Sequence, residues 1–245
     1  MSQLLSLVVP AYKQEKTIAK NIKLISKVLS NLSYDYELIV VVDGNLDDTF
    51  KNASKLKSSK VKILGYEKNR GKGYAVKFGA LKAKGDIIGF IDAGMDLDIS
   101  AITILVDYMD LHNADIVIGS KLHPDSVVEY PLFRVVLSWG YRTIIKSLFN
   151  LNVRDTQVGM KLFRRNVVKK VFPKILVRNF AFDIEVLAVS SALGYGKIFE
   201  APIKLKFNPG SISSSNFWKV VFWMLVDTFA VFYRLKVLNY YGKKK

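Results

Sequence analysis

Short apolar runs alternate with helical patterns between residues 4 and 120. The runs LLSLVV, ELIVVV, VKIL, DIIGFI and DIVI are rich in β-branched residues, which is typical of strands buried on both faces of a sheet. Between them, apolar residues recur at helical spacing, as in Ile18, Ile22 and Ile25. Strands that alternate with helices predict βαβ units and a mostly parallel, Rossmann-like sheet flanked by helices, so we expect an α/β fold.

The second half of the chain has longer apolar segments. Residues 131–150 predict one long helix, which is followed by a strand in GMKLFRR, a helix around residues 180–193 and a strand in APIKLKF. The aromatic residues 217–235 precede a basic tail, GKKK. We expect one catalytic domain over residues 1–212, which includes the 131–150 helix, and a C-terminal membrane-associated segment over residues 213–245.

The 131–150 helix should carry a basic stripe. Four residues follow one another at intervals of four and share one side of the helix: Arg134, Ser138, Arg142 and Lys146. Most other positions are apolar, and an apolar face opposite a basic stripe is typical of a helix that lies in a membrane interface. The alternative is a core helix with a solvated basic edge.

Residues 217–235 are long enough to cross a bilayer at about 1.5 Å per residue. Asp227 argues against a crossing, because a charge near the middle costs on the order of 3 kcal/mol. Lys219, Asp227 and Arg234 share one sector, which favours an amphipathic helix lying flat on the membrane. Several aromatic residues suit the interfacial zone: Trp218, Trp223, Tyr233, Tyr240 and Tyr241. We therefore expect a peripheral protein on the cytoplasmic face of the cell membrane.

The composition points to an anionic partner. Lys and Arg total 37 against 21 Asp and Glu, which gives a net charge of +16. Nucleic acid is disfavoured because the basic residues follow apolar helical faces instead of a base-reading motif. The chain has no Cys and two His, which excludes thiol catalysis and argues against a histidine metal site. The start, MSQLLSLVVP, lacks a basic lead and predicts a strand instead of a signal peptide.

Four polar stretches follow predicted strands: VVPAYKQE, VVDGNLDDT, NRGKGYA and FIDAGMDLD. The carboxyl ends of parallel strands meet at one edge of a sheet, where open α/β sheets bind ligands. Gly71 and Gly73 flank Lys72 at a helix start, where backbone amides could bind a phosphate. Asp92 and Asp96 could bind a divalent cation, although Asp and Gly are also ordinary turn residues.

These stretches, in this order and followed by DTQVGMKLFRR and FAFDIEVL, resemble the family 2 glycosyltransferases. Within that family the chain is most similar to the polyprenyl-phosphate sugar transferases, the dolichyl-phosphate glucose and mannose synthases. The resemblance spans roughly residues 4 to 210. It implies the GT-A (nucleotide-diphospho-sugar transferase) fold and the inverting transfer of one hexose from a nucleotide sugar to a dolichyl or other polyprenyl phosphate. The presence of both DTQVG and FDIE is typical of the glucose-type branch, so the resemblance favours UDP-glucose as donor over GDP-mannose.

The resemblance also implies roles for individual residues. Pro10, Tyr12 and Glu15 would frame the nucleobase and ribose, Asp43 would accept hydrogen bonds from them, and Lys72 would neutralise a phosphate. Val42 replaces one carboxylate of the usual Asp-Asp pair.

On the acceptor side, Arg134 and Ser138 correspond to positions that bind the lipid phosphate. Lys121 stands where relatives have Arg, so it keeps the charge and loses the bidentate geometry. Five further positions match those that line the sugar and acceptor side in relatives: Asp155, Gln157, Lys161, Asp183 and Glu185. The alternative for Asp183 and Glu185 is a buried acidic pair that tethers loops.

Relatives hold Mg²⁺ or Mn²⁺ with an Asp-x-Asp motif, whereas this chain reads Asp92-Ala93-Gly94. We expect Asp96 to replace the missing carboxylate and to bind the metal together with Asp92. A lipid phosphate is already a nucleophile, so the catalytic task is to stabilise the leaving diphosphate with the metal and nearby cations. The alternatives are transfer to another glycolipid or polysaccharide acceptor, and a membrane-bound nucleotide-sugar-binding protein that lost catalysis with Gly94.

Overall fold

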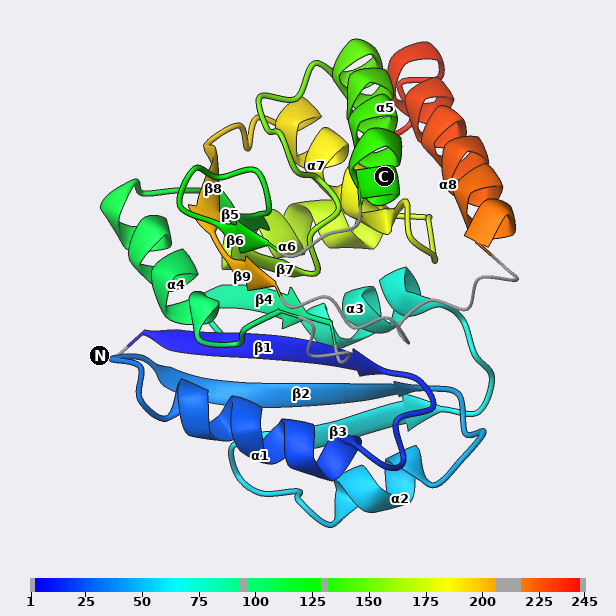
Figure 1. The fold of residues 1–245 in the computed structure, drawn as a ribbon. Coiled ribbons are helices and arrows are strands. Elements are labelled where there is room, and N and C mark those ends of the chain that lie inside the picture. Colours follow the sequence, from blue (N-terminus) through cyan, green and yellow to red (C-terminus); the bar gives the residue numbers. More distant parts are fainter. Residues whose placement is uncertain (1–2, 93–96, 129–131, 206–216, 243–245) are drawn as a thin grey trace.

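The computed structural model describes residues 3–92, 97–128, 132–205 and 217–242, without the side chains of residues 132–137 and 217. Its first half alternates strands and helices as expected (Figure 1): β1 (Leu4–Ala11), α1 (Ile18–Leu29), β2 (Asp35–Asp43), α2 (Thr49–Ser54), β3 (Val61–Tyr66), α3 (Lys72–Ala80), β4 (Ile87–Ile91), α4 (Ala101–Leu111) and β5 (Ile116–Ser120). The second half contains β6 (Val127–Val128), α5 (Leu132–Phe149), β7 (Met160–Arg164), α6 (Arg165–Val171), the 3-10 helix η1 (Phe172–Lys174), α7 (Phe182–Ala192), β8 (Ile198–Pro202), β9 (Lys204–Leu205), α8 (Phe217–Phe232) and the π-helix η3 (Tyr233–Val237).

Seven strands form one twisted sheet in the order β3-β2-β1-β4-β7-β5-β8. All neighbouring pairs are parallel except the two that involve β7, which runs antiparallel to β4 and β5. The mostly parallel sheet that the alternation predicts is therefore confirmed. The strand expected in APIKLKF is divided: β8 ends at Pro202, and β9 pairs with β6 in a small separate sheet.

Helices cover both faces of the sheet because both sets of alternating side chains are apolar. On β1, Leu7 and Val9 face a core cluster that contains residues of α1, α2 and α4. Val8 faces the opposite cluster, to which α3, α5, α6 and α7 contribute. Figure 1 shows α5 and α8 side by side beyond the second face. Two contacts join them: the Tyr141 and Thr228 hydroxyls lie 2.8 Å apart, and the Phe149 and Phe232 ring centroids 6.2 Å apart.

The apolar side of α5 is divided between the protein interior and the surface. Ile145 and Phe149 belong to the core, whereas Trp139 is 64% exposed. The alternative of a core helix with a polar edge therefore holds for the C-terminal half of α5. No helix within the described ranges combines the length and the hydropathy needed to cross a membrane.

Candidate functional site

The polar stretches that follow the predicted strands meet at one edge of the sheet. Asp43 ends β2, Asp92 follows β4, and Lys121 follows β5, and these three strands run in the same direction through the sheet. Because β7 is antiparallel, the residues that precede it reach the same edge: the Asp92 N–H donates to the Gly159 carbonyl at 2.9 Å. The structure thus brings the predicted site residues of four separate segments together.

Four charged side chains form a chain of ion pairs at the centre of this edge. The Lys72 ammonium, at the start of α3, lies 2.7 Å from Asp92 Oδ1 and 3.8 Å from Asp183 Oδ2. Lys161 of β7 pairs with the other oxygen of Asp183 and also donates to the Val158 carbonyl. Asp183 and Lys161 are buried, and Lys72 and Asp92 are partly open to solvent. Within this series of ion pairs, the Lys72–Asp92 pair is therefore the one that solvent or a ligand can reach.

The two lysines differ in their electrostatic environments. Burial opposes the charge of Lys72, but the carboxylates of Asp92 and Asp183 outweigh burial and raise the pKa of Lys72. Burial prevails at Lys161 and lowers its pKa, although Asp183 opposes the change. Lys161 was expected to line the sugar and acceptor side. This expectation is wrong, because Lys161 is fully buried and can act on a ligand only through Asp183.

Asp43 holds the loop that leads into α3. Its Oδ1 accepts from the Arg70 N–H at 2.7 Å, and its Oδ2 accepts from the Gly71 N–H at 2.9 Å and the Asn69 amide at 3.0 Å. Asp43 is 3% exposed. Its expected contact with base or ribose stays a prediction, and its observed contacts position the residues immediately before Lys72.

The start of α3 packs closely on the segment that precedes α7. Gly71 has φ +96°, and a Cβ there would lie 2.5 Å from the Arg178 carbonyl oxygen. That carbonyl accepts from the Gly73 and Tyr74 N–H groups at 2.7 and 3.3 Å. The phosphate cradle expected at Gly71-Lys72-Gly73 is therefore wrong for the Gly71 and Gly73 amides, since they donate to Asp43 and to the Arg178 carbonyl. The charged side chain of Lys72 is the group that α3 offers to an anion.

The loop after β1 carries the residues expected near the nucleotide. Pro10 is partly buried in β1, and Tyr12 and Glu15 are exposed. The Glu15 carboxylate accepts from the Asp48 N–H at 3.3 Å, and the Glu15 N–H donates to the Asp47 carboxylate at 3.3 Å. A surface cavity of about 510 Å³ adjoins this loop. The structure thus ties the loop to the start of α2, and the roles expected for its residues stay predictions.

Asp155 positions Lys121. Its Oδ2 accepts from the Lys121 N–H at 2.9 Å and lies 3.4 Å from the Lys121 ammonium. Asp155 is in turn held by Glu200 of β8, which accepts from the Asp155 N–H at 2.9 Å. Nearby in the sequence, the side-chain nitrogen of Gln157 is buried and has no acceptor among the described residues. An unsatisfied buried donor is costly, so Gln157 is a candidate to bind a ligand oxygen.

The expected metal site falls only partly within the described residues. Asp92 is described, and Asp96 lies outside. Within the described ranges, no group of three His, Cys, Asp or Glu side chains could hold an ion. The Asp92 side chain is 44% exposed although its Oδ1 is buried, so it can add one oxygen to an ion that takes its remaining ligands from phosphate and water. This donor set fits Mg²⁺ or Mn²⁺ bound to a diphosphate.

The residues expected to bind the lipid phosphate lie on α5. Ser138 is partly buried, and its backbone carbonyl accepts from Arg142 Nε at 3.2 Å. The side chain of Arg134 lies outside the described residues. Their role at a lipid phosphate stays a prediction.

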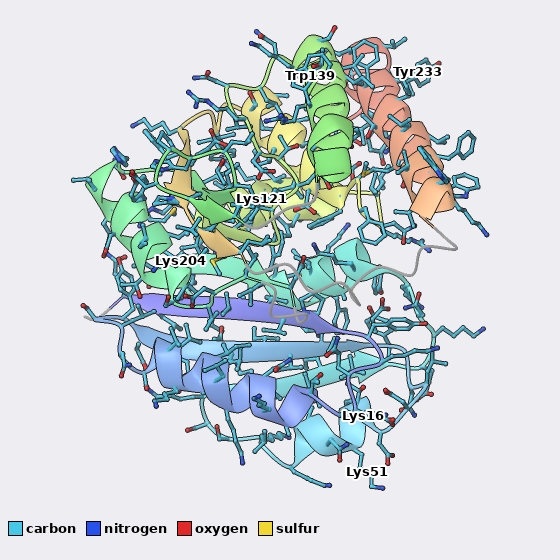
Figure 2. The ribbon with its side chains drawn as sticks, in the orientation of Figure 1. Lys16, Lys51, Lys121, Trp139, Lys204 and Tyr233 are labelled. Carbon is cyan, nitrogen blue, oxygen red and sulfur yellow. The ribbon has the colours of Figure 1, made fainter. Side chains whose placement is uncertain are left out.

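An exposed apolar stripe runs along the outer side of α8 and into η3. Its residues follow one another at intervals of three or four and are each at least 38% exposed: Trp218, Phe222, Val226, Phe229, Tyr233 and Val237. Figure 2 labels Tyr233 and the exposed Trp139 at the same end of the molecule, opposite the end that carries Lys16 and Lys51. We call these six residues the α8 apolar stripe. Contiguous exposed apolar patches mark interaction sites.

Two residues expected at a membrane interface lie elsewhere. Tyr241 is 1% exposed, and its hydroxyl donates to the buried carboxylate of Glu185. Arg234, assigned to the polar face of the C-terminal helix, lies 3.3 Å from the same carboxylate. The interfacial placement of Tyr241 is therefore wrong. The alternative for Asp183 and Glu185, a buried acidic pair that tethers loops, is confirmed for the burial of both and for the tethering by Glu185, which also accepts from the Leu176 and Val177 N–H groups.

Sequence reasoning missed two positions that shape the site. A Cβ on Gly159 would lie 2.1 Å from Asp92 Oδ2, so only glycine leaves room for that carboxylate. The Arg178 carbonyl holds the start of α3. The glycine in DTQVGMK was a visible signal for the first, whereas a backbone carbonyl leaves no signal in the sequence.

The chain is similar in sequence to known glycosyltransferases. The family model described as glycosyl transferase family 2 matches residues 6–172. Curated relatives include the dolichyl-phosphate beta-glucosyltransferases of Homo sapiens, 31% identical over 96% of this chain and 76% of the relative, and of Drosophila melanogaster, 33% identical over 77% and 63%. The Dictyostelium discoideum enzyme of the same name is 31% identical, and this chain spans 62% of its length.

Among solved structures, glucosyl-3-phosphoglycerate synthase from Mycobacterium tuberculosis, in complex with Mn²⁺, UDP and phosphoglyceric acid, superposes with a TM-score of 0.72. It is 20% identical, and the match covers 94% of this chain and 78% of that structure. This likeness confirms the expected GT-A fold. The match to the family model over most of the chain establishes its membership: the protein belongs to glycosyl transferase family 2.

Proposed function

We propose that this protein transfers glucose from UDP-glucose to a dolichyl or other polyprenyl phosphate at a membrane surface. The observation that carries the proposal is the Asp92–Lys72–Asp183 network at the strand-end edge of a family 2 chain. The curated relatives named as dolichyl-phosphate beta-glucosyltransferases support the choice of sugar and acceptor.

The reaction needs positive charge more than it needs a base. An acceptor phosphate oxygen forms the new bond to the anomeric carbon, the bond to the UDP oxygen breaks, and UDP leaves from the opposite side with inversion. Lys72 would face the diphosphate, and its raised pKa keeps it charged at neutral pH. Lys121, held by Asp155, and Arg134 supply charge on the acceptor side, so that two anions can approach each other.

Asp92, together with Asp96, would hold Mg²⁺ or Mn²⁺ against the diphosphate. When bound, the ion adds positive charge where the leaving group becomes more negative. Gln157 offers its buried side-chain amide to a sugar oxygen. Asp183 fixes the direction of Lys72 from within the protein.

The membrane part of the proposal depends on the α8 apolar stripe. Aromatic residues prefer the bilayer interface, and Lys219 and Lys236 on the same segment are exposed. A lipid phosphate acceptor keeps its phosphate at that interface. A protein that lies on the membrane through α8 and α5 would meet its acceptor there without crossing the bilayer.

The activity test offers radiolabelled UDP-glucose or GDP-mannose with a polyprenyl phosphate in detergent, followed by organic extraction. We expect label from UDP-glucose in the lipid phase, its loss on addition of EDTA, and its return with excess Mg²⁺ or Mn²⁺. Lys72→Met should lower the rate by about a hundredfold or more. If the protein binds UDP yet labels no lipid with either donor, it is a binding protein and the proposal is wrong.

Flotation with liposomes tests the membrane surface separately. The double variant Phe222→Ser/Phe229→Ser removes two rings from the α8 apolar stripe, and Leu111→Ser is the control because Leu111 is 77% exposed on the distant α4. We expect the wild type and the control to float with anionic liposomes and the double variant to remain in solution. Equal flotation of all three would show that another surface binds the lipid.

A further inference from the structure

A carboxylate that the proposed mechanism does not use lies in the first turn of α7. Glu185 is fully buried and accepts hydrogen bonds from two directions. The Leu176 and Val177 N–H groups donate to its Oε2 at 2.9 and 2.7 Å. The Tyr241 hydroxyl and the Arg234 guanidinium donate to its Oε1, the guanidinium at 3.3 Å. Glu185 therefore joins the loop before α7 to the segment that follows α8.

The contacts on the C-terminal side form a closed set. Arg234 Nε also donates to the Tyr241 hydroxyl at 2.9 Å, so the three side chains contact one another in pairs. Burial raises the pKa of Tyr241, and the neighbouring charge of Glu185 adds to the effect, so the phenol keeps its proton. A buried carboxylate that lost these donors would be left unsatisfied. Movement of Tyr241 away from its observed position would therefore leave the Glu185 carboxylate with fewer hydrogen-bond donors.

The contacts on the other side lead to the donor end of the site. The Val177 N–H donates to Glu185, and the carbonyl of the next residue, Arg178, accepts from the Gly73 N–H at 2.7 Å. Lys72, the residue before Gly73, extends its ammonium into the network at the strand-end edge. Two consecutive residues of one loop therefore connect the buried carboxylate to the start of α3.

We propose that Glu185 is a positioning residue that couples the docking of the C-terminal segment, residues 233–241, to the placement of Lys72. The inference rests on the proposed function, in which Lys72 meets the diphosphate of the donor. The C-terminal segment shares Tyr233 and Val237 with the α8 apolar stripe, so the coupling gives the surface that meets the membrane an influence on donor binding. Loss of the Tyr241 contact should loosen the loop at 176–178 and, through it, the start of α3.

The test replaces single hydroxyl groups and follows backbone amides. Tyr241→Phe removes the donor to Glu185 and keeps the ring, and Tyr240→Phe makes the same change one residue away as the control. We expect hydrogen–deuterium exchange at residues 176–177 and 73–74 to become about tenfold faster in Tyr241→Phe and to be unchanged in the control. The dissociation constant for UDP, measured by calorimetry, should rise about fivefold in Tyr241→Phe only.

Glu185→Gln provides a second perturbation from the other partner. It keeps the shape of the side chain but loses the charge that pairs with Arg234, so it should speed exchange at both pairs of amides. Unchanged exchange at residues 73–74 in both variants would overturn the coupling, even if residues 176–177 exchange faster. Failure of the wild type to bind UDP would instead refute the proposed function, and the exchange result would still decide the coupling.

Discussion

Replacement of Lys161 by methionine would remove the ammonium that pairs with Asp183 in the interior of the site. Methionine matches the length of the lysine stem, so the change creates little empty space. Asp183 is 2% exposed and would lose its shorter ion pair, keeping Lys72 at 3.8 Å. Breaking a buried pair from one side costs about 3–5 kcal/mol, and the remaining partner favours the lower end. We expect the free energy of unfolding to fall by about 3 kcal/mol.

Urea unfolding followed by circular dichroism measures this change. In a chain of this length the corresponding fall in Tm is about 6–12 °C. The control is Lys60→Met, which removes a lysine from an ion pair of 2.7 Å that is about half exposed on both sides. That variant should unfold at nearly the same urea concentration as wild type, because exposed pairs contribute little to stability.

A double-mutant cycle separates the pair from its surroundings. In Lys161→Met/Asp183→Asn the uncompensated charge is gone, so the double variant should be more stable than the sum of the single changes implies, by at least about 1 kcal/mol. Equal destabilisation by Lys161→Met and Lys60→Met would show that burial does not increase the contribution of an ion pair to stability. Additive effects of the two changes at Lys161 and Asp183 would show that these residues do not interact, and either result would refute the reasoning.

Three further changes test local geometry. Gly159→Ala places a Cβ 2.1 Å from Asp92 Oδ2, so the displaced carboxylate should lower the sugar-transfer rate by at least about tenfold; wild-type rates would contradict this. Gly140→Ala adds a methyl group within α5, where a Cβ meets no described atom within 4 Å: calorimetry should show a gain of about 0.5–1 kcal/mol, and a loss would mean that the position is not open. Asp43→Asn places an amide NH₂ group against the N–H donors of the loop before α3, so the free energy of unfolding in urea should fall by about 1–3 kcal/mol. An unchanged free energy would show that the loop keeps its structure without the carboxylate.

The order of the strands shows where sequence patterns succeed and where they stop. The apolar runs of β1 to β5 predict buried parallel strands because helices separate them and both faces are apolar. The run GMKLFRR predicts a strand, but nothing in its seven residues gives its direction. The antiparallel placement of β7 depends on pairing with β4 and β5, which are distant in the sequence.

Helix amphipathicity has a related limit. The pattern of α5 predicts an apolar face but does not say what covers it, and the structure covers Ile145 and Phe149 with protein while leaving Trp139 exposed. The same limit applies to Tyr241, an aromatic residue before a basic tail, which packs inward where a buried carboxylate accepts a hydrogen bond from its hydroxyl.

Sequence patterns predict the location of some residues of the candidate site but not the burial of others. Asp43, Asp92 and Lys121 could be predicted because each ends a strand or directly follows one, and parallel topology then brings them together. Lys161 could be matched to a family position, but its burial could not be predicted. A lysine in a strand usually faces solvent, and Asp183, brought close by the fold, together with the Val158 carbonyl makes full burial tolerable.

The spacing of the two carboxylates in FDIE explains why the first turn of α7 contacts two separate groups of charged and polar side chains. Residues two apart on an α-helix point about 200° away from each other, so Asp183 and Glu185 must face opposite sides of α7. One faces the lysines at the strand-end edge, and the other faces Arg234 and Tyr241. The helix N-terminus favours negative charge on either side. Two acidic residues at this spacing are therefore not a catalytic pair: one belongs to the site, and the other fixes the element that carries it.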